Sequence, residues 1–427
     1  MKINNIKYMN LWEENQMDFI DNMIAERLGG NSFFKQSKTT YKFEKIKNLT
    51  QEVIAKNPGI RLIDMGVGEP DQRADDEIID ILNTEARKLE NRFYSDNGIE
   101  EFKIAAYKYL KKVYNLNNIN EKNIMHGIGS KSILATLPLC FINEGDICIM
   151  PKPAYQVLGT NTKYLGGEVY EMPINEENNF LLEFEKIPKE ILEKTKMIYI
   201  NYPNNPTGHI ATKEYYEKLI KFAKENKILV VCDAAYSNLT YDGYKPLSIM
   251  SIDGAIDVCI EIHSLSKSFN MTGWRIGFIV ANEKIIKAYG CVKSNIDSGQ
   301  FRAIQLAGAY ALENSLRFVE KNINRYDRRL NMLVKALREI GFDAKKPQGG
   351  FYIYTKIPKG IKNNQRFENA EQVSLYILEK CMISTVPWDD SGSYLRFSVT
   401  YEAKDIEDEK YIMQEIKKRM KSLDLEF

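Results

Sequence analysis

The chain has 427 residues, 44% of them hydrophobic, and this length allows a large domain and a smaller one around a buried active site. Its 59 basic and 58 acidic residues leave a net charge of +1, so no overall field draws it to nucleic acid or to an anionic membrane. We therefore expect small molecules as partners, with no nucleic acid and no membrane.

Neither a metal site nor a disulfide framework is expected. The three histidines form no H-x-x-x-H pair and the six cysteines form no C-x-x-C pair. Several cysteines lie in apolar runs and are expected to be small buried hydrophobic residues in a reducing compartment; the six are Cys140, Cys148, Cys232, Cys259, Cys291 and Cys381. The start, MKINNIKYMNLWEENQ, has no apolar core of signal-peptide length, and no stretch reaches the roughly 18 uncharged apolar residues of a membrane helix. We expect a cytoplasmic protein.

The segment HGIGSKSIL, residues 126–134, is the first with a chemical signature. Gly127, Gly129, Ser130 and Lys131 stand at the start of an apolar helix, where free backbone N–H groups and the helix dipole favour a phosphate. Ser132 occupies the position of the last glycine of G-x-G-x-x-G, which disfavours a nicotinamide dinucleotide.

Three apolar runs bounded by turn-forming residues predict buried strands at 197–202, 228–232 and 258–262. Residues 214–226 place apolar side chains at three- and four-residue steps, which predicts an amphipathic helix. Strands and helices alternate from about residue 121 to 280, which indicates an α/β fold with a largely parallel sheet. Such sheets bind ligands at the carboxyl ends of their strands. A later helix, within RRLNMLVKALREIGFDA, is expected to end at Gly341.

Polar residues follow each predicted strand at once, as PNNPTG (203–208), DAAY (233–236) and HSLSK (263–267). A phosphate at the helix near Ser130 could also be bound by the hydroxyls of Ser264 and Ser266 and by the guanidinium of Arg275. A partly desolvated lysine beside that phosphate, Lys267, has a lowered pKa and can condense with an aldehyde.

A carboxylate at the end of a buried strand completes the set, because Asp233 would keep a pyridine nitrogen protonated and make the ring an electron sink. These residues together indicate pyridoxal phosphate. In this order and spacing, NNPTG, DAAYSNLTY and SLSKSFNMTGWRIG resemble the fold type I aminotransferases of the aspartate aminotransferase superfamily, from about Tyr41 onward. The resemblance implies a large domain with a mostly parallel sheet between helices and a smaller α+β domain. It divides the chain into an N-terminal arm with part of the small domain (1–71), a large cofactor domain (72–314) and a small C-terminal domain (315–427).

The resemblance also implies roles for the matching residues around the cofactor ring. Lys267 would form the Schiff base and serve as general base and acid, and Asp233 would partner the pyridine nitrogen. Asn205 and Tyr236 would bind the phenolic oxygen, and Tyr155 would stack on the ring.

The phosphate and the substrate are assigned in the same way. The implied phosphate-binding residues are Ser130, Lys131, Ser264, Ser266 and Arg275. Tyr94 resembles a tyrosine that reaches the phosphate of the neighbouring subunit, which implies a homodimer with shared sites. Arg396 would pair with the substrate α-carboxylate, and the backbone of Gly68 would approach it. The predicted substrate-binding residues are thus Tyr41, Gly68, Asn205 and Arg396.

Within the superfamily, GVGEPD, NRFYSDNGIEEF, SNIDSGQF and ISTVPWDDSG resemble the LL-diaminopimelate aminotransferases. This implies transfer of an amino group between LL-2,6-diaminopimelate and 2-oxoglutarate in lysine biosynthesis, with Tyr41 contacting the substrate. Two departures are present. The segment before about Phe33 has no counterpart, and YSDNG stands where better-known members have a longer loop with a glutamate facing the distal amino group.

Three alternatives stay open. Another aminotransferase of this fold, acting on alanine, aspartate or aromatic amino acids, would share every cofactor residue. A lyase on this scaffold would need no keto acceptor, and a cofactor-sensing regulator would need a basic helix-turn-helix module, which the mixed charge of the first 75 residues does not suggest. We expect Asp96 and Asp389 to be solvated loop acids rather than ligands of a distal ammonium group.

Overall fold

The structure, a computed structural model, describes residues 23–30, 42–363 and 365–427. It divides into two units, Met1–Ile60 and Arg61–Phe427. Within the first unit, a 3-10 turn, η1 (Glu26–Leu28), and a helix, α3 (Lys42–Lys56), are described. The predicted substrate residue Tyr41 lies outside the described residues.

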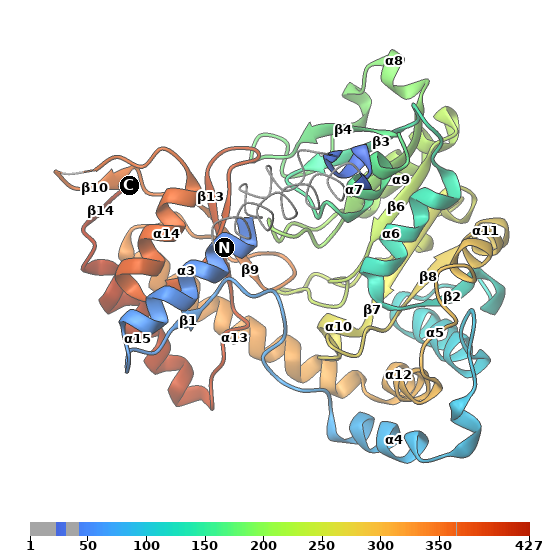
Figure 1. Ribbon diagram of the computed structural model, residues 1–427, viewed down its shortest axis with the longest axis horizontal. Helices are drawn as coiled ribbons and strands as arrows, with labels where there is room; N and C mark the ends of the chain where they lie inside the picture. The colour runs from blue at the N-terminus through green and yellow to red at the C-terminus, as the bar shows by residue number, and fades with distance from the viewer. Residues whose placement is uncertain (1–22, 31–41, 364) are drawn as a thin grey trace, which may run out of the picture. The chain divides into compact units, whose positions relative to one another are not determined.

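A seven-stranded sheet forms the centre of the second unit (Figure 1). Its order is β2-β8-β7-β6-β5-β3-β4, with β2 (Ile124–Gly127), β3 (Ile147–Lys152), β4 (Glu168–Pro173), β5 (Thr195–Asn201), β6 (Leu229–Asp233), β7 (Cys259–Ser264) and β8 (Gly277–Ala281). Strands β4, β3, β5, β6 and β7 pair in parallel, whereas β8 is antiparallel to both of its neighbours. The three strands predicted from apolar runs, now β5, β6 and β7, and the largely parallel sheet are confirmed.

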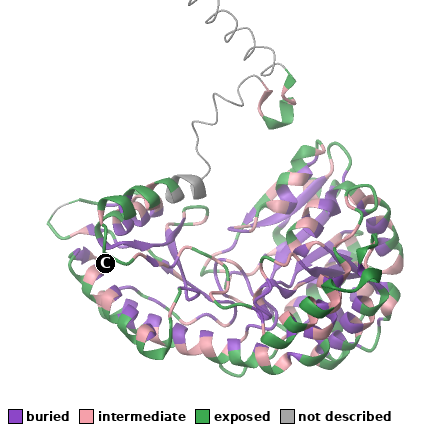
Figure 2. Cartoon of the chain, turned by 60° about the horizontal axis from the view of Figure 1, so that its bottom comes forward, coloured by how far each residue is buried: buried purple, intermediate pink, exposed green. Residues whose placement is uncertain are grey.

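Alternate residues of each strand point to opposite faces of the sheet, and each face is covered by helices. In β5, Ile198 and Ile200 enter one apolar core, and Met197 and Tyr199 enter another. The first core takes side chains from α4 (Asp76–Ala86), α5 (Glu100–Tyr114), α9 (Lys213–Asn226) and α12 (Arg302–Asn314). The second takes them from α6 (Gly129–Phe141), α7 (Val157–Tyr164) and α11 (Glu283–Lys293). The strands between these layers are largely buried, apart from the edge strand β4 (Figure 2).

A third apolar core belongs to the C-terminal part of the chain. It contains residues of an antiparallel sheet of order β12-β13-β9, formed by β9 (Tyr352–Lys356), β12 (Val386–Trp388) and β13 (Tyr394–Ser398). The helices α13 (Leu316–Ile340), α14 (Ala370–Cys381) and α15 (Ile406–Lys421) pack on it. The short β1 (Ile63–Asp64) pairs in parallel with β11 (Ile383–Ser384), so the start of the unit joins this C-terminal core. Helix α13 ends at Ile340 before a positive-φ Gly341, as predicted.

A buried ion-pair network fixes the chain after β1 to two helices of the C-terminal core. Arg329 of α13 contacts Asp71 at 2.9 Å and Glu409 of α15 at 2.8 Å, and each of the three side chains is at most 3% exposed. The carboxylate of Glu409 also accepts hydrogen bonds from Arg328. Because each charge has a partner, the network can lie inside the protein.

The remaining described elements are short. They are η3 (Leu89–Arg92), η4 (Glu121–Asn123), η5 (Phe184–Lys186), α8 (Lys189–Leu192), η6 (Ile249–Ser251), η7 (Ala255–Asp257), α10 (Leu265–Ser268), β10 (Gly360–Ile361) and β14 (Leu425–Glu426). Across the described part of the chain, no helix has the length and apolar character needed to span a bilayer.

Candidate active site

The predicted site residues gather where β5, β6 and β7 end. In the parallel register Asn201 of β5 lies opposite Asp233 of β6, which in turn lies opposite Ile262 of β7. The turn after β7 leads directly into α10, which carries Lys267. Parallel strands bring their carboxyl ends to one edge, so segments about 30 residues apart in sequence meet there, as the sequence predicted.

Lys267 is held as an amine that loses its proton easily. Its Nζ donates a hydrogen bond of 2.7 Å to the carbonyl oxygen of Gly68, in the segment after β1. Its pKa is lowered from 10.5 to about 8, mainly by burial; the carboxylate of Glu69 acts in the opposite direction, and the cationic Arg275 and Arg396 contribute to the lowering. A lysine in this state can act as a nucleophile or as a general base near neutral pH.

Asp233 is buried, with 5% of its surface exposed, and its carboxylate is held by two donors. The N–H of Ala235 donates to Oδ1 and the hydroxyl of Tyr199 donates to Oδ2, both at 3.2 Å. Burial raises its pKa to about 6, whereas these two hydrogen bonds and the nearby His263 and Lys267 favour the ionised form. The carboxylate is therefore positioned to carry a negative charge at neutral pH.

Arg396 of β13 reaches from the C-terminal core into the same site. Its Nη1 donates to Oδ1 of Asn205 and its Nη2 donates to the carbonyl oxygen of Gly66, each at 2.9 Å. The guanidinium lies 4.1 Å from the centre of the Tyr352 ring, whose hydroxyl is 3.1 Å from that of Tyr236. A planar guanidinium held in this way presents a fork that suits a carboxylate.

Gly68 must be a glycine, because a Cβ there would overlap the hydroxyl of Tyr352. The carbonyl oxygen of Gly68 is also the acceptor for Lys267. The segment after β1 therefore lies against both β9 and the lysine, close enough for its backbone to approach a ligand.

A cradle of small and basic residues surrounds the N-terminus of α6. Gly129 begins this helix with φ +74°, and a Cβ there would lie 2.6 Å from Nη2 of Arg275. The backbone of Gly277 approaches the Ser130 nitrogen, since a Cβ on Gly277 would lie 3.5 Å from that atom. Arg275 itself has φ 56°, a conformation that bulky residues rarely adopt outside functional sites. Free helix N–H groups beside a guanidinium form an anion site.

The hydroxyls of Ser264 and Ser266 lie at the start of α10. The side chain of Ser264 accepts a hydrogen bond from the N–H of Ser266, so it also caps this short helix. Ser266 is 4% exposed, and Ser264 is half-buried. Because Ser264 lies opposite Gly277 in the antiparallel register, α10 and the cradle around α6 are adjacent.

The comparisons with known proteins agree with this geometry. Residues 60–408 match the family model described as aminotransferase class I and II. The chain belongs to the aminotransferase class I and II family. The LL-diaminopimelate aminotransferase of Methanocaldococcus jannaschii is 50% identical over 96% of this chain and 99% of its own, and that of Methanococcus maripaludis is 47% identical over 96% and 99%. The substrate-bound BacF structure from Bacillus subtilis has a TM-score of 0.80 at 32% identity, covering 88% of this chain and 94% of its own. The fold class and the aminotransferase activity expected from the motifs are thereby confirmed.

Three predicted residues of this aminotransferase are half-buried or exposed. Lys131 is exposed on the first turn of α6, and Tyr155 is half-buried against the second sheet core. Tyr94 is 81% exposed on the loop after η3. Asp389 accepts hydrogen bonds from the N–H groups of Ala370 and Glu371, so it binds the start of α14. Asp389 is nevertheless exposed in the loop after β12, as expected of a solvated loop acid.

One expectation about the cysteines was wrong. Cys291 is exposed on α11, whereas four others are buried and Cys140 is half-buried. Among the described residues there is no group of three or more His, Cys, Asp or Glu side chains that could hold a metal ion.

Sequence reasoning missed residues that form hydrogen bonds to the predicted site residues and so fix their positions. Asn201 donates from Nδ2 to the carbonyl oxygen of Asp233 at 2.7 Å and accepts the N–H of Asn205 at 2.9 Å, so it joins two of the predicted segments. Tyr199 contacts the same aspartate. Both lie in MIYINY at alternate positions, and this two-residue spacing ahead of the polar turn was the available signal. Tyr352 was also missed.

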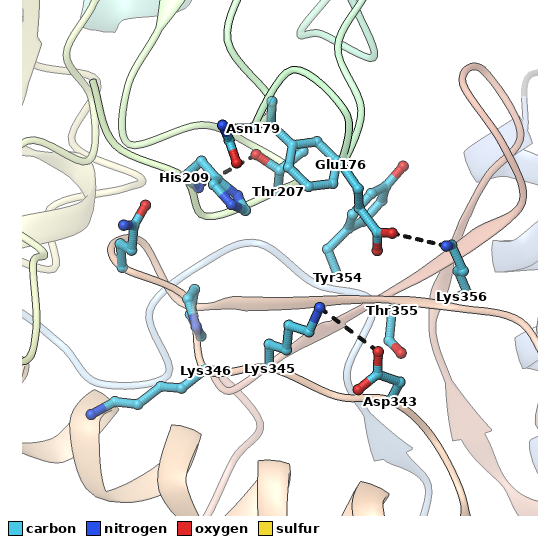
Figure 3. Close-up of a pocket in the computed structure, with 13 residues that line it drawn as sticks. Glu176, Asn179, Thr207, His209, Asp343, Lys345, Lys346, Tyr354, Thr355 and Lys356 are labelled. Carbon is cyan, nitrogen blue, oxygen red and sulfur yellow. Dashed lines mark hydrogen bonds and ion pairs between the residues drawn. The ribbon is translucent and has the colours of Figure 1, made fainter. Parts of the chain in front are cut away.

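A hollow of about 330 Å³ lies elsewhere, beside the part of the turn after β5 that contains Thr207 and His209 (Figure 3). It is lined by Thr207 and His209 from that turn, by the loop around Glu176, and by residues before and within β9. Its charges are paired, since Lys356 contacts Glu176 at 2.9 Å. Neither Lys267, Asp233 nor Arg396 lines it, so we place the reaction at the strand ends and not in this hollow.

Proposed function

We propose that this chain is a pyridoxal-phosphate-dependent LL-diaminopimelate aminotransferase, which moves an amino group from LL-2,6-diaminopimelate to 2-oxoglutarate in lysine biosynthesis. Its relatives at 50% and 47% identity over nearly their full length carry that name. The main structural support for this chemistry is that Asp233 of β6, Lys267 of α10 and Arg396 of β13 lie close together.

The residues present fit pyridoxal phosphate. The space that a Cβ on Gly129 would fill, beside Arg275 and the N-terminus of α6, suits a phosphate. Lys267 would hold the aldehyde carbon covalently, and Asp233 would accept the pyridinium N–H. When bound, this cofactor supplies an electron sink for the negative charge that develops when the substrate Cα loses its proton.

Two side chains of this protein carry the proton and the charge. With a pKa of about 8, the amine of Lys267 is neutral in an appreciable fraction of molecules at neutral pH, and its Nζ can take the proton from the substrate Cα and return it. Asp233 must stay ionised to hold a pyridinium, so we expect activity to fall as pH decreases through about 6.

Arg396 would bind the α-carboxylate of either substrate. Its two outer nitrogens already donate to Asn205 and to the backbone of Gly66, which fixes the plane of the guanidinium. Its Nε is buried with no hydrogen-bond partner within the described part of the chain. A carboxylate would satisfy this group and bring the Cα of the substrate toward Lys267.

We also propose a homodimer with shared sites. The turn η3 and the loop after it expose Leu89 (73%), Phe93 (57%) and Tyr94 (81%), and the neighbouring loop exposes Ile296 (53%) and Phe301 (45%). The two loops are adjacent, because the Ser95 hydroxyl donates to the carbonyl oxygen of Gln300 at 2.7 Å. Exposed apolar side chains in one patch are typical of an interface. Mixing inactive Lys267→Ala and Tyr94→Ala proteins should restore activity if Tyr94 serves the partner's site.

The substrate is tested by turnover. Glutamate formation from 2-oxoglutarate should be fastest with LL-diaminopimelate, compared with the meso isomer, alanine, aspartate and phenylalanine. Lys267→Ala should abolish turnover and the borohydride-stable attachment of pyridoxal phosphate, whereas Lys284→Ala, on the exposed side of α11, should leave both intact. Faster turnover with alanine, aspartate or phenylalanine would show that the proposed substrate is wrong. A turnover of Lys267→Ala close to that of the unmodified protein would refute the mechanism. The division at residues 71 and 314, the small-domain role of the C-terminal core, and the cytoplasmic location stay predictions.

A further inference from the structure

Tyr199 is a fully buried tyrosine beside the candidate cofactor site, with no exposed surface. It lies on β5 two residues before Asn201, so both side chains point to the same face of the sheet. That face is also the face of Asp233, because β5 and β6 are parallel and Asn201 is in register with Asp233. Neighbouring strands thus place a phenol next to the carboxylate.

The phenol of Tyr199 acts as a donor. Burial raises its pKa well above 10, so it keeps its proton over the whole range in which the protein works. Its hydroxyl donates to Oδ2 of Asp233 at 3.2 Å, while the N–H of Ala235 donates to Oδ1. One protein donor on each oxygen fixes the plane of the carboxylate and leaves each oxygen able to accept a further hydrogen bond.

We propose that Tyr199 is a positioning residue that keeps the carboxylate of Asp233 ionised and correctly oriented for the pyridine ring of the cofactor. The inference rests on the proposed cofactor. Its physical basis is that a hydrogen bond donated to a buried carboxylate stabilises the charged form, and that a group with only two protein donors depends strongly on each.

Other groups facing Asp233 cannot replace this donor. His263 of β7 and Lys267 of α10 lie near enough to favour the charged form, but no hydrogen bond joins either to the carboxylate within the described residues. Tyr236, in the segment after β6, directs its hydroxyl to Tyr352. Cys232, the residue before Asp233, points to the other face of the sheet, and burial raises the pKa of its thiol, which stays neutral.

The test measures cofactor affinity rather than turnover. Full-length protein freed of cofactor is titrated calorimetrically from pH 5 to pH 9 with pyridoxine 5′-phosphate, which lacks the aldehyde and cannot react with Lys267. Affinity should decrease below the pKa of Asp233 in the free protein, about 6. We call the pH at which affinity begins to decrease the break. In Tyr199→Phe the break should move up by about one pH unit, because one hydrogen bond to a carboxylate usually changes its pKa by about that much.

The ligand has titratable groups of its own, and they affect its binding to both proteins equally. Dividing the affinity of the unmodified protein by that of Tyr199→Phe at each pH cancels this effect. We expect Tyr199→Phe to bind within about twofold of the unmodified protein at pH 8, about fivefold more weakly at pH 6 and about tenfold more weakly at pH 5. The matched control is Tyr202→Phe, which removes a buried hydroxyl that contacts Phe180 and Leu182 on the other face of the sheet. Its affinity ratio should not change with pH.

The outcomes separate this inference from the proposed function. If Asp233→Asn leaves the break in place, the cofactor role of Asp233 itself is wrong. If Asp233→Asn removes the break but Tyr199→Phe leaves it at the same pH, or weakens binding equally at every pH, only the role of Tyr199 is wrong. If Tyr199→Phe does not fold, the test uses 3-fluorotyrosine at position 199, whose hydroxyl is a stronger hydrogen-bond donor. This variant should move the break to lower pH. A break that stays at the same pH or moves to higher pH would show that Tyr199 does not have the proposed role.

Discussion

The lowered pKa of Lys267 can be measured without any cofactor. At pH 7.5 a lysine with a pKa of about 8 is neutral in about a quarter of molecules, whereas one with a pKa of 10.5 is neutral in about one in a thousand. Since only the neutral amine acylates, Lys267 should react about 240-fold faster, per molecule, than an amine of equal nucleophilicity and access with the ordinary pKa.

The assay uses trace amounts of acetic anhydride between pH 6 and pH 11, with N-α-acetyl-lysine in the same tube as the reference amine. Mass spectrometry of the peptide that contains Lys267 gives its acetylation at each pH. The rate should level off with a midpoint near pH 8, while that of the reference continues to rise past pH 10. A midpoint at or above pH 10 would show that burial and the neighbouring cations do not perturb this amine, and the reasoning from the site geometry would fail.

Three further predictions concern other parts of the molecule. Arg329→Met should lower the free energy of unfolding in urea by about 3–5 kcal/mol, because it leaves the buried carboxylate of Asp71 without its partner. Gly129→Ala should weaken pyridoxal phosphate binding at least about tenfold, measured by equilibrium titration, since the new methyl group would lie 2.6 Å from the guanidinium of Arg275. Arg396→Lys should lower kcat/KM about 10- to 100-fold for the amino acid and the oxo acid alike, because a lysine cannot present the same planar fork.

Each of these three variants has a matched control. Lys335→Met changes an exposed residue of α13 and should alter stability by less than about 0.5 kcal/mol. Gly145→Ala imposes a similar positive-φ strain, since Gly145 has φ +79°, but it meets nothing within 4 Å and should leave cofactor affinity unchanged. Arg366→Lys alters an exposed arginine and should not affect kcat/KM. A control that behaves like its partner variant would contradict the explanation given for that pair.

The sequence predicted the elements around the site closely, because their signals are local. Helix α9 begins at Lys213 and ends at Asn226, against a predicted 214–226, since its apolar side chains repeat at helical spacing. Strand β6 ends at Asp233, one residue beyond the predicted apolar run, because a polar residue can still belong to the ladder. The proximity of the candidate residues at strand ends could be predicted because parallel topology brings strand ends together.

Features that depend on long-range pairing were not predictable in this way. The run GFIVA that forms β8 is apolar in either direction, so nothing in it indicates an antiparallel strand. Tyr199 reads as one more apolar strand residue, and its bond to Asp233 depends on the register of two strands. The contact of Arg396 with Asn205 joins residues 191 apart in sequence, which no local pattern encodes.

The antiparallel β8 has a consequence for how the chain can change in evolution. Ser264 and Gly277 are paired across the base of the segment that contains Lys267 and Arg275, so this segment is a closed loop whose two ends are tied to each other. A single inserted or deleted residue between them could be accommodated only by displacing the lysine relative to the arginine or by slipping β8 against both neighbours. Length variation among functional descendants of this protein should therefore accumulate in surface connections such as the one between α5 and η4, and be excluded from residues 264–277.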